Sequence, residues 1–203
     1  TIVDSPAYGG NIWSIAIDDD YVYYGGSTTN KVRKAYKTNL STITDSPNYG
    51  GTIYSISIDD DYVYYGGLAT NKVRKAYKTN LATITDSPGY GGEIRSIYID
   101  DDYVYYGGRE TQTVRKAYKN NLSTITNSPN YGGIIMSISI DDDYVYYGGY
   151  TTNKVRKAYK TNLSTITDSP DYGGAIYSIS IDKKNKLKIN LFSPENNELF
   201  NQN

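Results

Sequence analysis

Residues 55–67 of the chain read SISIDDDYVYYGG, and this stretch decides the predicted fold. Its first four residues alternate polar and apolar side chains, which is typical of a strand with one buried face. The aspartates at 59–61 are a turn signal, and the segment YVYY at 62–65 is aromatic and β-branched, as strands are. The stretch therefore predicts two antiparallel strands joined by a short acidic turn.

The same pattern returns at a fixed spacing of 41 residues. The string DSPAYGG and its variants begin at Asp4, Asp45, Asp86, Asn127 and Asp168, without insertion or deletion. Four complete repeats follow one another, and the fifth departs from the pattern after Asp182. A strict repeat of this length predicts an array of equivalent structural units.

Each repeat has the pattern of a four-stranded sheet. In the first repeat the predicted strands cover 12–17, 21–24, 31–37 and 40–44, separated by turn signals. No segment has a sustained 3.6-residue apolar period, which argues against helical repeats. Four strands in 41 residues match one blade of a β-propeller, in which stacking buries both faces of each sheet. The predicted fold is all-β: a five-bladed β-propeller of 41-residue, four-stranded blades.

We expect residues 1–203 to form a single propeller domain with a closed ring. The predicted blades cover about 10–44, 51–85, 92–126, 133–167 and 174–203. Because 1–3 aligns with the end of a fourth strand, this N-terminal strand is expected to complete the last blade. Its other strands are expected at 175–181, 186–192 and 198–200. An open or oligomerising fragment of a longer array is the alternative.

The repeats resemble a known group of propellers. The stretch at 55–67, followed by TNKVRK at 70–75, is similar to the repeats of YVTN, NHL and PQQ-like propellers, which are WD40-like blades. The resemblance covers 4–182 and implies the fold. It implies no particular function, because propellers include enzymes, lectins and protein-binding scaffolds, and it does not imply the PQQ cofactor.

Composition excludes several chemistries. The chain has no cysteine and no histidine, which removes disulfides, thiolate zinc sites and the usual general base. A formal net charge of −1, from 21 basic and 22 acidic residues, argues against a nucleic-acid partner. No apolar run has the length of a transmembrane helix, so no membrane insertion is expected. We also expect no cofactor.

The chain has an unusually high content of tyrosine, with 25 residues, and most of them occupy five fixed positions in each complete repeat. In the first repeat these are Tyr8, Tyr21, Tyr23, Tyr24 and Tyr36. Large rings fill the gaps between twisted sheets while their hydroxyls reach polar partners. We therefore expect the fixed tyrosines to pack between blades.

Two further chemistries have candidate residues in the sequence. The aspartate triplets that begin at Asp18 and its equivalents suit calcium in composition, but they lack the spacing of a calcium loop, so polar turns are preferred and no metal site is expected. A glycoside-processing enzyme needs a pair of carboxylates in a cleft. The asymmetric candidates are few, namely Glu93, Arg95, Arg109 and Glu110, all in the third repeat, so no catalytic residue is expected and the enzyme stays an alternative.

The copies differ most at three columns, each of which holds four different residues in the complete repeats. The columns contain Asn11, Thr52, Glu93 and Ile134, with Ala175 in the fifth repeat; Trp13, Tyr54, Arg95 and Met136, with Tyr177 in the fifth; and Ser27, Leu68, Arg109 and Tyr150. In an antiparallel meander, these columns lie in the two connections that leave the sheet at one edge. The turns at the opposite edge are nearly invariant, so we predict a ligand-binding surface at the variable edge.

The predicted function is non-catalytic recognition, with two classes of partner. A lectin-like surface would use aromatic platforms such as Trp13, Tyr54, Tyr150 and Tyr177, whereas a protein partner would be anchored by Trp13, Arg95, Met136 and Tyr150. The competing hypothesis is a purely structural or assembly role, in which the variable edge is simply free to diverge. The chain is expected to be a monomer or part of a larger chain or assembly, and its composition is compatible with an extracellular, virion-surface or cell-surface protein.

Overall fold

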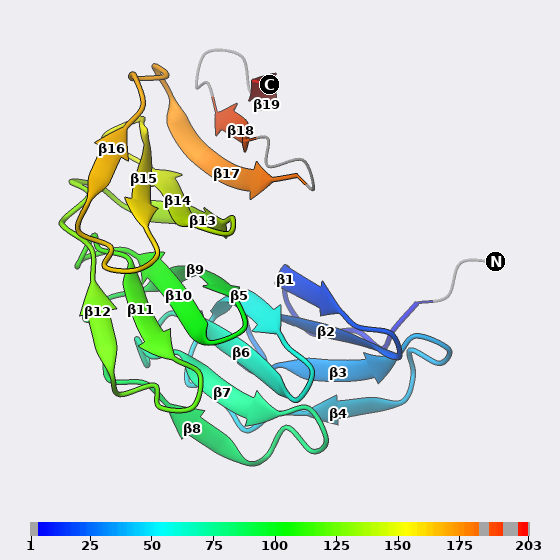
Figure 1. Ribbon diagram of the computed structural model, residues 1–203. Helices are drawn as coiled ribbons and strands as arrows, with labels where there is room; N and C mark the ends of the chain where they lie inside the picture. Colours follow the sequence, from blue (N-terminus) through cyan, green and yellow to red (C-terminus); the bar gives the residue numbers. More distant parts are fainter. Residues whose placement is uncertain (1–3, 183–186, 193–198, 203) are drawn as a thin grey trace. The chain divides into compact units, whose positions relative to one another are not determined.

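The computed structural model describes residues 4–182, 187–192 and 199–202. Every regular element among them is a β-strand, so the all-β prediction is confirmed. The strands form four four-stranded antiparallel sheets, one for each complete repeat, followed by a fifth sheet (Figure 1). The repeat length read from the sequence is therefore the length of one sheet.

The first sheet shows how a repeat folds. It consists of β1 (Ile12–Ile17), β2 (Tyr21–Gly26), β3 (Arg33–Tyr36) and β4 (Ile43–Asp45), hydrogen-bonded in chain order. Ile15 is paired with Tyr24, and the register shifts between Ile12 and Ser14, so Trp13 lies in a β-bulge. Bulges re-aim side chains at sheet ends, and here the bulge falls on a variable column.

The later repeats follow the same order. The second sheet contains β5 (Ile53–Ile58), β6 (Tyr62–Gly67), β7 (Arg74–Tyr77) and β8 (Ile84–Asp86); the third contains β9 (Ile94–Ile99), β10 (Tyr103–Gly108), β11 (Arg115–Tyr118) and β12 (Ile125–Asn127); the fourth contains β13 (Ile135–Ile140), β14 (Tyr144–Gly149), β15 (Val155–Tyr159) and β16 (Ile166–Asp168). The fifth contains β17 (Ala175–Ile181), β18 (Leu187–Phe192) and β19 (Leu199–Gln202).

Two predicted strands are longer than the observed ones. The fourth strand was expected from residue 40, but the Asn39 side chain accepts a hydrogen bond from the Ser41 amide at 3.1 Å, which turns the chain and delays β4 until Ile43. The third strand was expected from residue 31, but Asn30 adopts a positive φ of 54° and β3 begins at Arg33. A side-chain hydrogen bond delays β4, and a residue in the left-handed backbone region precedes β3.

The chain forms two compact units, Thr1–Ile99 and Asp100–Asn203. The expectation of one domain stays a prediction, as does the closed five-bladed ring. Residues 1–3, which were expected to complete the last blade, lie outside the described residues. No helix among the described residues is long and apolar enough to cross a membrane.

The fixed tyrosines fill much of the core, as predicted, but not at every position. Tyr23, Tyr49 and Tyr65 belong to one buried cluster of the first unit, and Tyr105, Tyr131 and Tyr147 to one of the second. The prediction of core packing is wrong for the column that begins with Tyr36, because the side chains of that column are exposed. Tyr36 packs on Tyr21 at the surface, with ring centroids 4.6 Å apart.

Consecutive sheets pack face to face through a small residue and two isoleucines. A Cβ placed on Gly25 would lie 3.0 Å from Ile53 and 3.2 Å from Ile56 of the next sheet. The Ser14 hydroxyl also accepts a hydrogen bond from the Ile56 amide at 2.9 Å. Glycine therefore sets the close approach of one sheet to the next.

Candidate functional site

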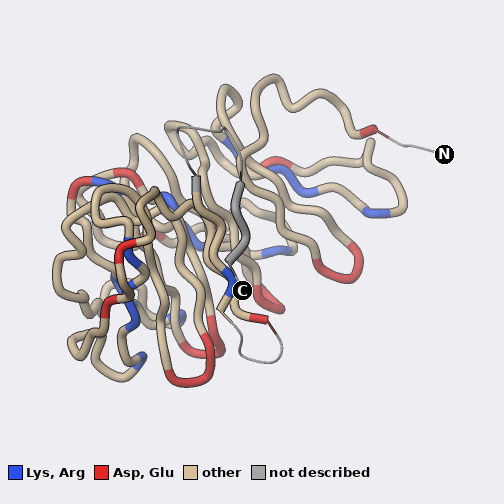
Figure 2. The backbone as a smooth tube through the Cα atoms, turned by 90° about the horizontal axis from the view of Figure 1, so that it is seen from above, with Lys and Arg blue, Asp and Glu red and all other residues tan. Residues whose placement is uncertain are grey.

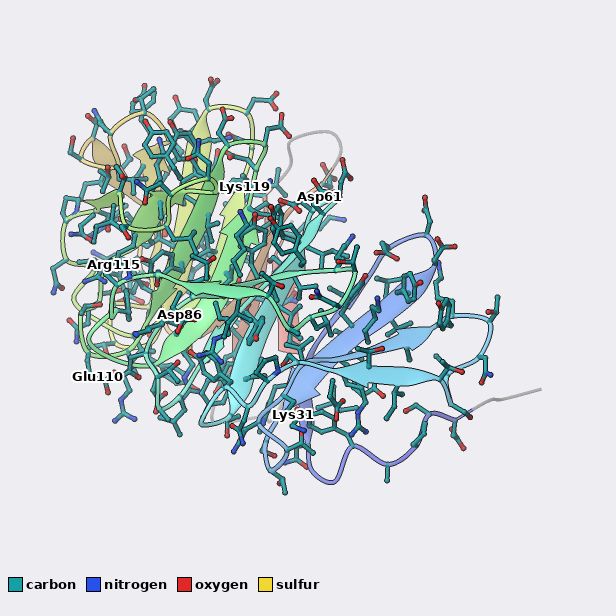
Figure 3. All side chains as sticks on the ribbon, turned by 90° about the horizontal axis from the view of Figure 1, so that it is seen from below. Lys31, Asp61, Asp86, Glu110, Arg115 and Lys119 are labelled. Atoms are coloured by element: carbon teal, nitrogen blue, oxygen red, sulfur yellow. The ribbon has the colours of Figure 1, made fainter. Side chains whose placement is uncertain are left out.

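Each four-stranded sheet has two different ends. We call the end that carries the connection into the first strand and the loop between the second and third strands the loop edge. The turn edge carries the other two turns. Lys31 lies in a loop-edge segment and Asp61 in a turn-edge segment of the first unit, and Figure 3 shows them at opposite ends of the strands.

The loop edge brings two variable columns into contact. The Ser27 amide donates to the Asn11 backbone oxygen at 3.0 Å, and the Asn11 amide donates to the Ser27 hydroxyl at 3.1 Å. The same backbone bond joins Leu68 to Thr52 at 2.9 Å. Ile134 and Tyr150 form this contact in the fourth repeat, at 3.0 Å.

Invariant residues fix the backbone on which these side chains vary. A Cβ on Gly26 would overlap the backbone oxygen of Asn11, so only glycine lets the incoming connection cross there. The buried Tyr8 hydroxyl accepts from the Gly26 amide at 3.0 Å and donates to the Lys31 backbone oxygen at 2.6 Å. One tyrosine thus ties the two connections together, and Tyr49 does the same in the second repeat.

The loop edge also holds strained backbone. The residue after the third variable column has a positive φ in each complete repeat: 76° at Thr28, 85° at Ala69, 67° at Glu110 and 83° at Thr151. This region disfavours residues with a Cβ, above all β-branched threonine. Strain of this kind persists where the surroundings hold it and clusters at binding and catalytic sites.

In the first unit, the second variable column forms a continuous row across three sheets. The Trp13 and Tyr54 rings meet edge to face with centroids 6.2 Å apart. The Arg95 guanidinium lies 4.0 Å from the centroid of the Tyr54 ring, and the same guanidinium is paired with the Glu93 carboxylate. We call these four residues the Trp13 row. Trp13 is its most open member, 57% exposed.

In the second unit, the predicted residues make a different contact. The Tyr150 and Tyr177 rings pack edge to face with centroids 5.3 Å apart, and their hydroxyls are hydrogen-bonded to each other. Arg109 forms a surface ion pair with Glu110 at 3.4 Å. Met136, Ile134 and Ala175 are half-buried.

The turn edge is a structural joint that the sequence did not reveal. The Asp18 carboxylate accepts from the Asp20 and Tyr21 amides at 3.1 and 2.8 Å, which makes the acidic turn. It also accepts from the Tyr23 hydroxyl at 3.0 Å and forms an ion pair with Lys78 of the next repeat at 2.8 Å. The second unit repeats this joint between Asp100 and Lys160, also at 2.8 Å.

The electrostatics of the joint favour an ionised aspartate. Partial burial raises the pKa of Asp18, but the hydrogen bonds from Lys78, Tyr21, Tyr23 and Asp20 outweigh burial and lower the pKa to about 2. The periodicity of the sequence does not indicate that the lysine paired with Asp18 comes from the next repeat. The recurrence of both residue types in each complete repeat was the available signal.

The turn edge of the first unit also contains a hollow of about 520 Å³. Its lining includes the Asp18 turn, Lys34, Asp60 and Lys78. The Lys34 ammonium already donates to the Lys78 backbone oxygen at 2.6 Å and lies 4.3 Å from the Tyr21 ring centroid. The described residues contain no group of three or more acidic side chains arranged to hold a metal ion. Figure 2 colours all Asp and Glu residues red, and the acidic turns are among them.

Comparisons with solved structures identify proteins with a similar fold. No protein-family model matches, and no curated protein matches. The computationally designed Ika8 protein has a TM-score of 0.79 and 13% identity, covering 92% of this chain and 57% of its own. The chain thus spans little more than half of that protein.

Two solved lyase structures are also similar. Virginiamycin B lyase from Staphylococcus aureus has a TM-score of 0.75 and 15% identity, with 94% of this chain and 69% of the lyase covered. A streptogramin B lyase structure has a TM-score of 0.77 and 14% identity, with 97% and 70% covered. Identities this low show the fold alone, and they confirm the resemblance to YVTN-type propellers at that level. The chain has a β-propeller fold built from highly regular internal repeats.

Proposed function

We propose that the chain is a non-catalytic recognition module that binds a protein ligand through its loop edge. The observation that carries the proposal is the Trp13 row: residues that differ from copy to copy meet in space, on a backbone held by invariant glycines and tyrosines. Tryptophan, tyrosine and arginine are the residues that dominate the binding energy of protein interfaces.

The contacts that cover the aromatic rings favour a protein ligand over a glycan ligand. A multivalent lectin needs an open ring face in each repeat. One face of Tyr54 is covered by the Arg95 guanidinium, and Tyr150 and Tyr177 pack on each other. Trp13 is left as the most exposed ring of the set, which suits an asymmetric anchor better than a series of equal sugar platforms.

The alternatives have less support. Glu93 and Glu110 each face an arginine of their own repeat, an arrangement that neutralises charge rather than pairing two carboxylates. One of the similar lyase structures is described as a catalytically inactive histidine-to-alanine variant, and this chain has no histidine.

A purely structural role accounts for the invariant turn edge, where conserved contacts join the sheets, but not for the contact-forming side chains at the loop edge.

The test is a comparison of Trp13→Ala with Asp60→Ala. The purified chain is assayed by quantitative pull-down from cell-surface extracts and on a glycan array. We expect saturable binding to a protein that Trp13→Ala weakens about 30-fold, the loss of an interface anchor worth about 2 kcal/mol. Arg95→Ala is expected to weaken it as well.

Asp60→Ala is the matched control, because Asp60 is exposed at the turn edge. It is expected to leave binding within about twofold. Equal loss in Trp13→Ala and Asp60→Ala, or no saturable binding in either assay, contradicts the proposal. Binding to glycans alone, lost one repeat at a time, supports the lectin instead.

A further inference from the structure

Each complete repeat carries a pair of tyrosines on two neighbouring strands of its own sheet. Tyr21 begins β2 and lies directly opposite Tyr36, the last residue of β3. Their rings are tilted by 43° and their centroids are 4.6 Å apart. The later pairs have centroids 4.5 Å apart in Tyr62–Tyr77, 4.6 Å in Tyr103–Tyr118 and 4.6 Å in Tyr144–Tyr159. One arrangement of two phenols thus occurs in four copies.

Solvent reaches these pairs. The third-strand tyrosine is 42–43% exposed in all four complete repeats, and the second-strand tyrosine is half-buried. Another invariant pair of the first repeat, Tyr8 with Tyr24, has centroids 5.7 Å apart, and both of its side chains are buried. A reagent in solution therefore has access to Tyr21 and Tyr36 but not to Tyr8 and Tyr24.

The neighbours of the second-strand tyrosine hold its ring beside the partner ring. The Lys34 ammonium lies 4.3 Å from the centroid of the Tyr21 ring and is itself anchored, since it donates to the Lys78 backbone oxygen at 2.6 Å. A hydrogen bond with Tyr36 is the main cause that raises the pKa of Tyr21 to about 12, so Tyr21 keeps its proton at neutral pH. The ammonium contact recurs at 3.7 Å for Lys75, 3.8 Å for Lys116 and 4.0 Å for Lys157.

Two phenols that are held side by side are suited to oxidative coupling. When each loses one electron, the two rings can join by a carbon–carbon bond, and holding the reactants together favours reaction within a molecule over reaction between molecules. The chain has no cysteine, so no disulfide can link its strands. The tyrosine pairs give it another side-chain chemistry that can make such a link.

We propose that the four pairs are sites at which a peroxide-driven one-electron oxidant reinforces the sheets by joining the two rings as dityrosine. Each phenol loses one electron and its hydroxyl proton, and a bond forms between a Cε atom of Tyr21 and a Cε atom of Tyr36. The hydrogen on each bonded Cε atom then moves to the hydroxyl oxygen of its own ring, which restores both phenols. One hydrogen peroxide takes up the two electrons and two protons and becomes two waters. The product links the second and third strands of one sheet.

The experiment treats the full chain, in dilute solution, with a haem peroxidase and hydrogen peroxide, and maps its tryptic peptides by mass spectrometry. We expect the monomer to contain peptides of the second strand joined to the third-strand tripeptide Ala-Tyr-Lys, with two hydrogen atoms lost at each link. This tripeptide is identical in the four complete repeats, so a variant is needed to assign it. Tyr36→Phe is expected to remove the link from the peptide of Tyr21 and to leave the other three.

The matched control is Tyr24→Phe, which removes a buried phenol from the same tryptic peptide as Tyr21 and is expected to leave all four links. A link that stays on the Tyr21 peptide in Tyr36→Phe, or that is lost from it in Tyr24→Phe, overturns the proposal. Dityrosine that is absent, or that is found only between molecules, also overturns it.

Thermal unfolding tests the reinforcement itself. A covalent link between two strands restricts the unfolded chain, as a disulfide does, so peroxidase treatment is expected to raise Tm by about 5 °C or more. The control combines Tyr36→Phe, Tyr77→Phe, Tyr118→Phe and Tyr159→Phe, which keeps the ring packing and removes the third-strand phenols. Treatment is expected to change its Tm by less than about 1 °C. A rise of equal size in both proteins, or a rise in neither, overturns the proposal.

Discussion

Two glycines show how differently one residue type acts along this chain. Gly26 lies where the incoming connection crosses the end of β2, with no room for a side chain beside the Asn11 backbone. Gly89 occupies a column that holds alanine, asparagine or aspartate in other repeats, and nothing lies within 4 Å of its would-be Cβ. Invariance at one position and drift at the other follow directly from the available space.

At the residue scale, we predict opposite effects for Gly26→Ala and Gly89→Ala. Gly26→Ala is expected to lower the free energy of unfolding by about 3 kcal/mol, because its Cβ displaces backbone rather than a flexible side chain. Gly89→Ala is expected to raise it by about 0.5 kcal/mol by restricting the unfolded chain. Urea denaturation measures both changes in the free energy of unfolding. Losses of similar size in the two variants contradict the difference in room for a Cβ at the two positions.

At the element scale, the turn between the first two strands is also the joint between sheets. The Asp18 carboxylate makes the turn, accepts from the tyrosine of its own second strand and pairs with Lys78 of the next sheet. One side chain thus serves local structure and packing together. The invariance of the turn edge has this structural cause and requires no ligand.

The joint predicts a specific dependence on pH. Because the pKa of Asp18 is lowered from 3.8 to about 2, its contribution to stability is complete above about pH 4 and is lost as the pH falls toward 2. Asp18→Asn keeps a turn acceptor and removes the charge. We expect it to cost about 1 kcal/mol at pH 6, since solvent screens a carboxylate that is 24% exposed, and almost nothing at pH 2.

The matched control for this prediction is Asp20→Asn in the same turn. Its side chain is exposed, so the substitution is expected to change the free energy of unfolding by less than about 0.5 kcal/mol at pH 6. Denaturant titrations at several pH values give the comparison. A cost for Asp18→Asn that is the same at pH 6 and pH 2 shows that ionisation does not stabilise the joint.

At the scale of the whole molecule, the chain is a series of equivalent interfaces. Gly25 packs on Ile53 and Ile56 as Gly66 packs on Ile94 and Ile97. In such arrays, stability is close to a sum of repeat and nearest-neighbour contributions. Removing one whole repeat leaves every remaining interface with a partner of the same chemistry.

Deletion of residues 45–85 is therefore expected to give a folded protein. The deletion joins Thr44 to Asp86 and seats Gly25 on Ile94 and Ile97. We expect circular dichroism typical of the intact chain and a urea m-value lower by about a fifth, in proportion to the surface lost. Deleting 45–64 instead breaks the spacing and is expected to prevent cooperative unfolding. Loss of folding in both deletions contradicts independent repeats.

A comparison of predicted and observed strands shows which parts of the fold could be predicted from the sequence. The range of β17 was predicted as observed, and β1 likewise, because apolar alternation repeats in each copy and each copy supports the next. The start of β4 was missed, since the Asn39 side chain competes with the strand ladder. At the loop edge, the variable columns could be located from the differences between copies, but not the order in which Trp13, Tyr54 and Arg95 contact one another.

The amino-acid sequence by itself determined the strands, their antiparallel order and the length of the repeat, because these depend on neighbours close along the chain. Only the tertiary structure decided that Asp18 pairs with Lys78 and that Arg95 covers Tyr54. Each of these contacts joins residues of consecutive repeats that are far apart along the chain. They follow from how closely one sheet packs against the next, and periodicity within a repeat does not fix that distance.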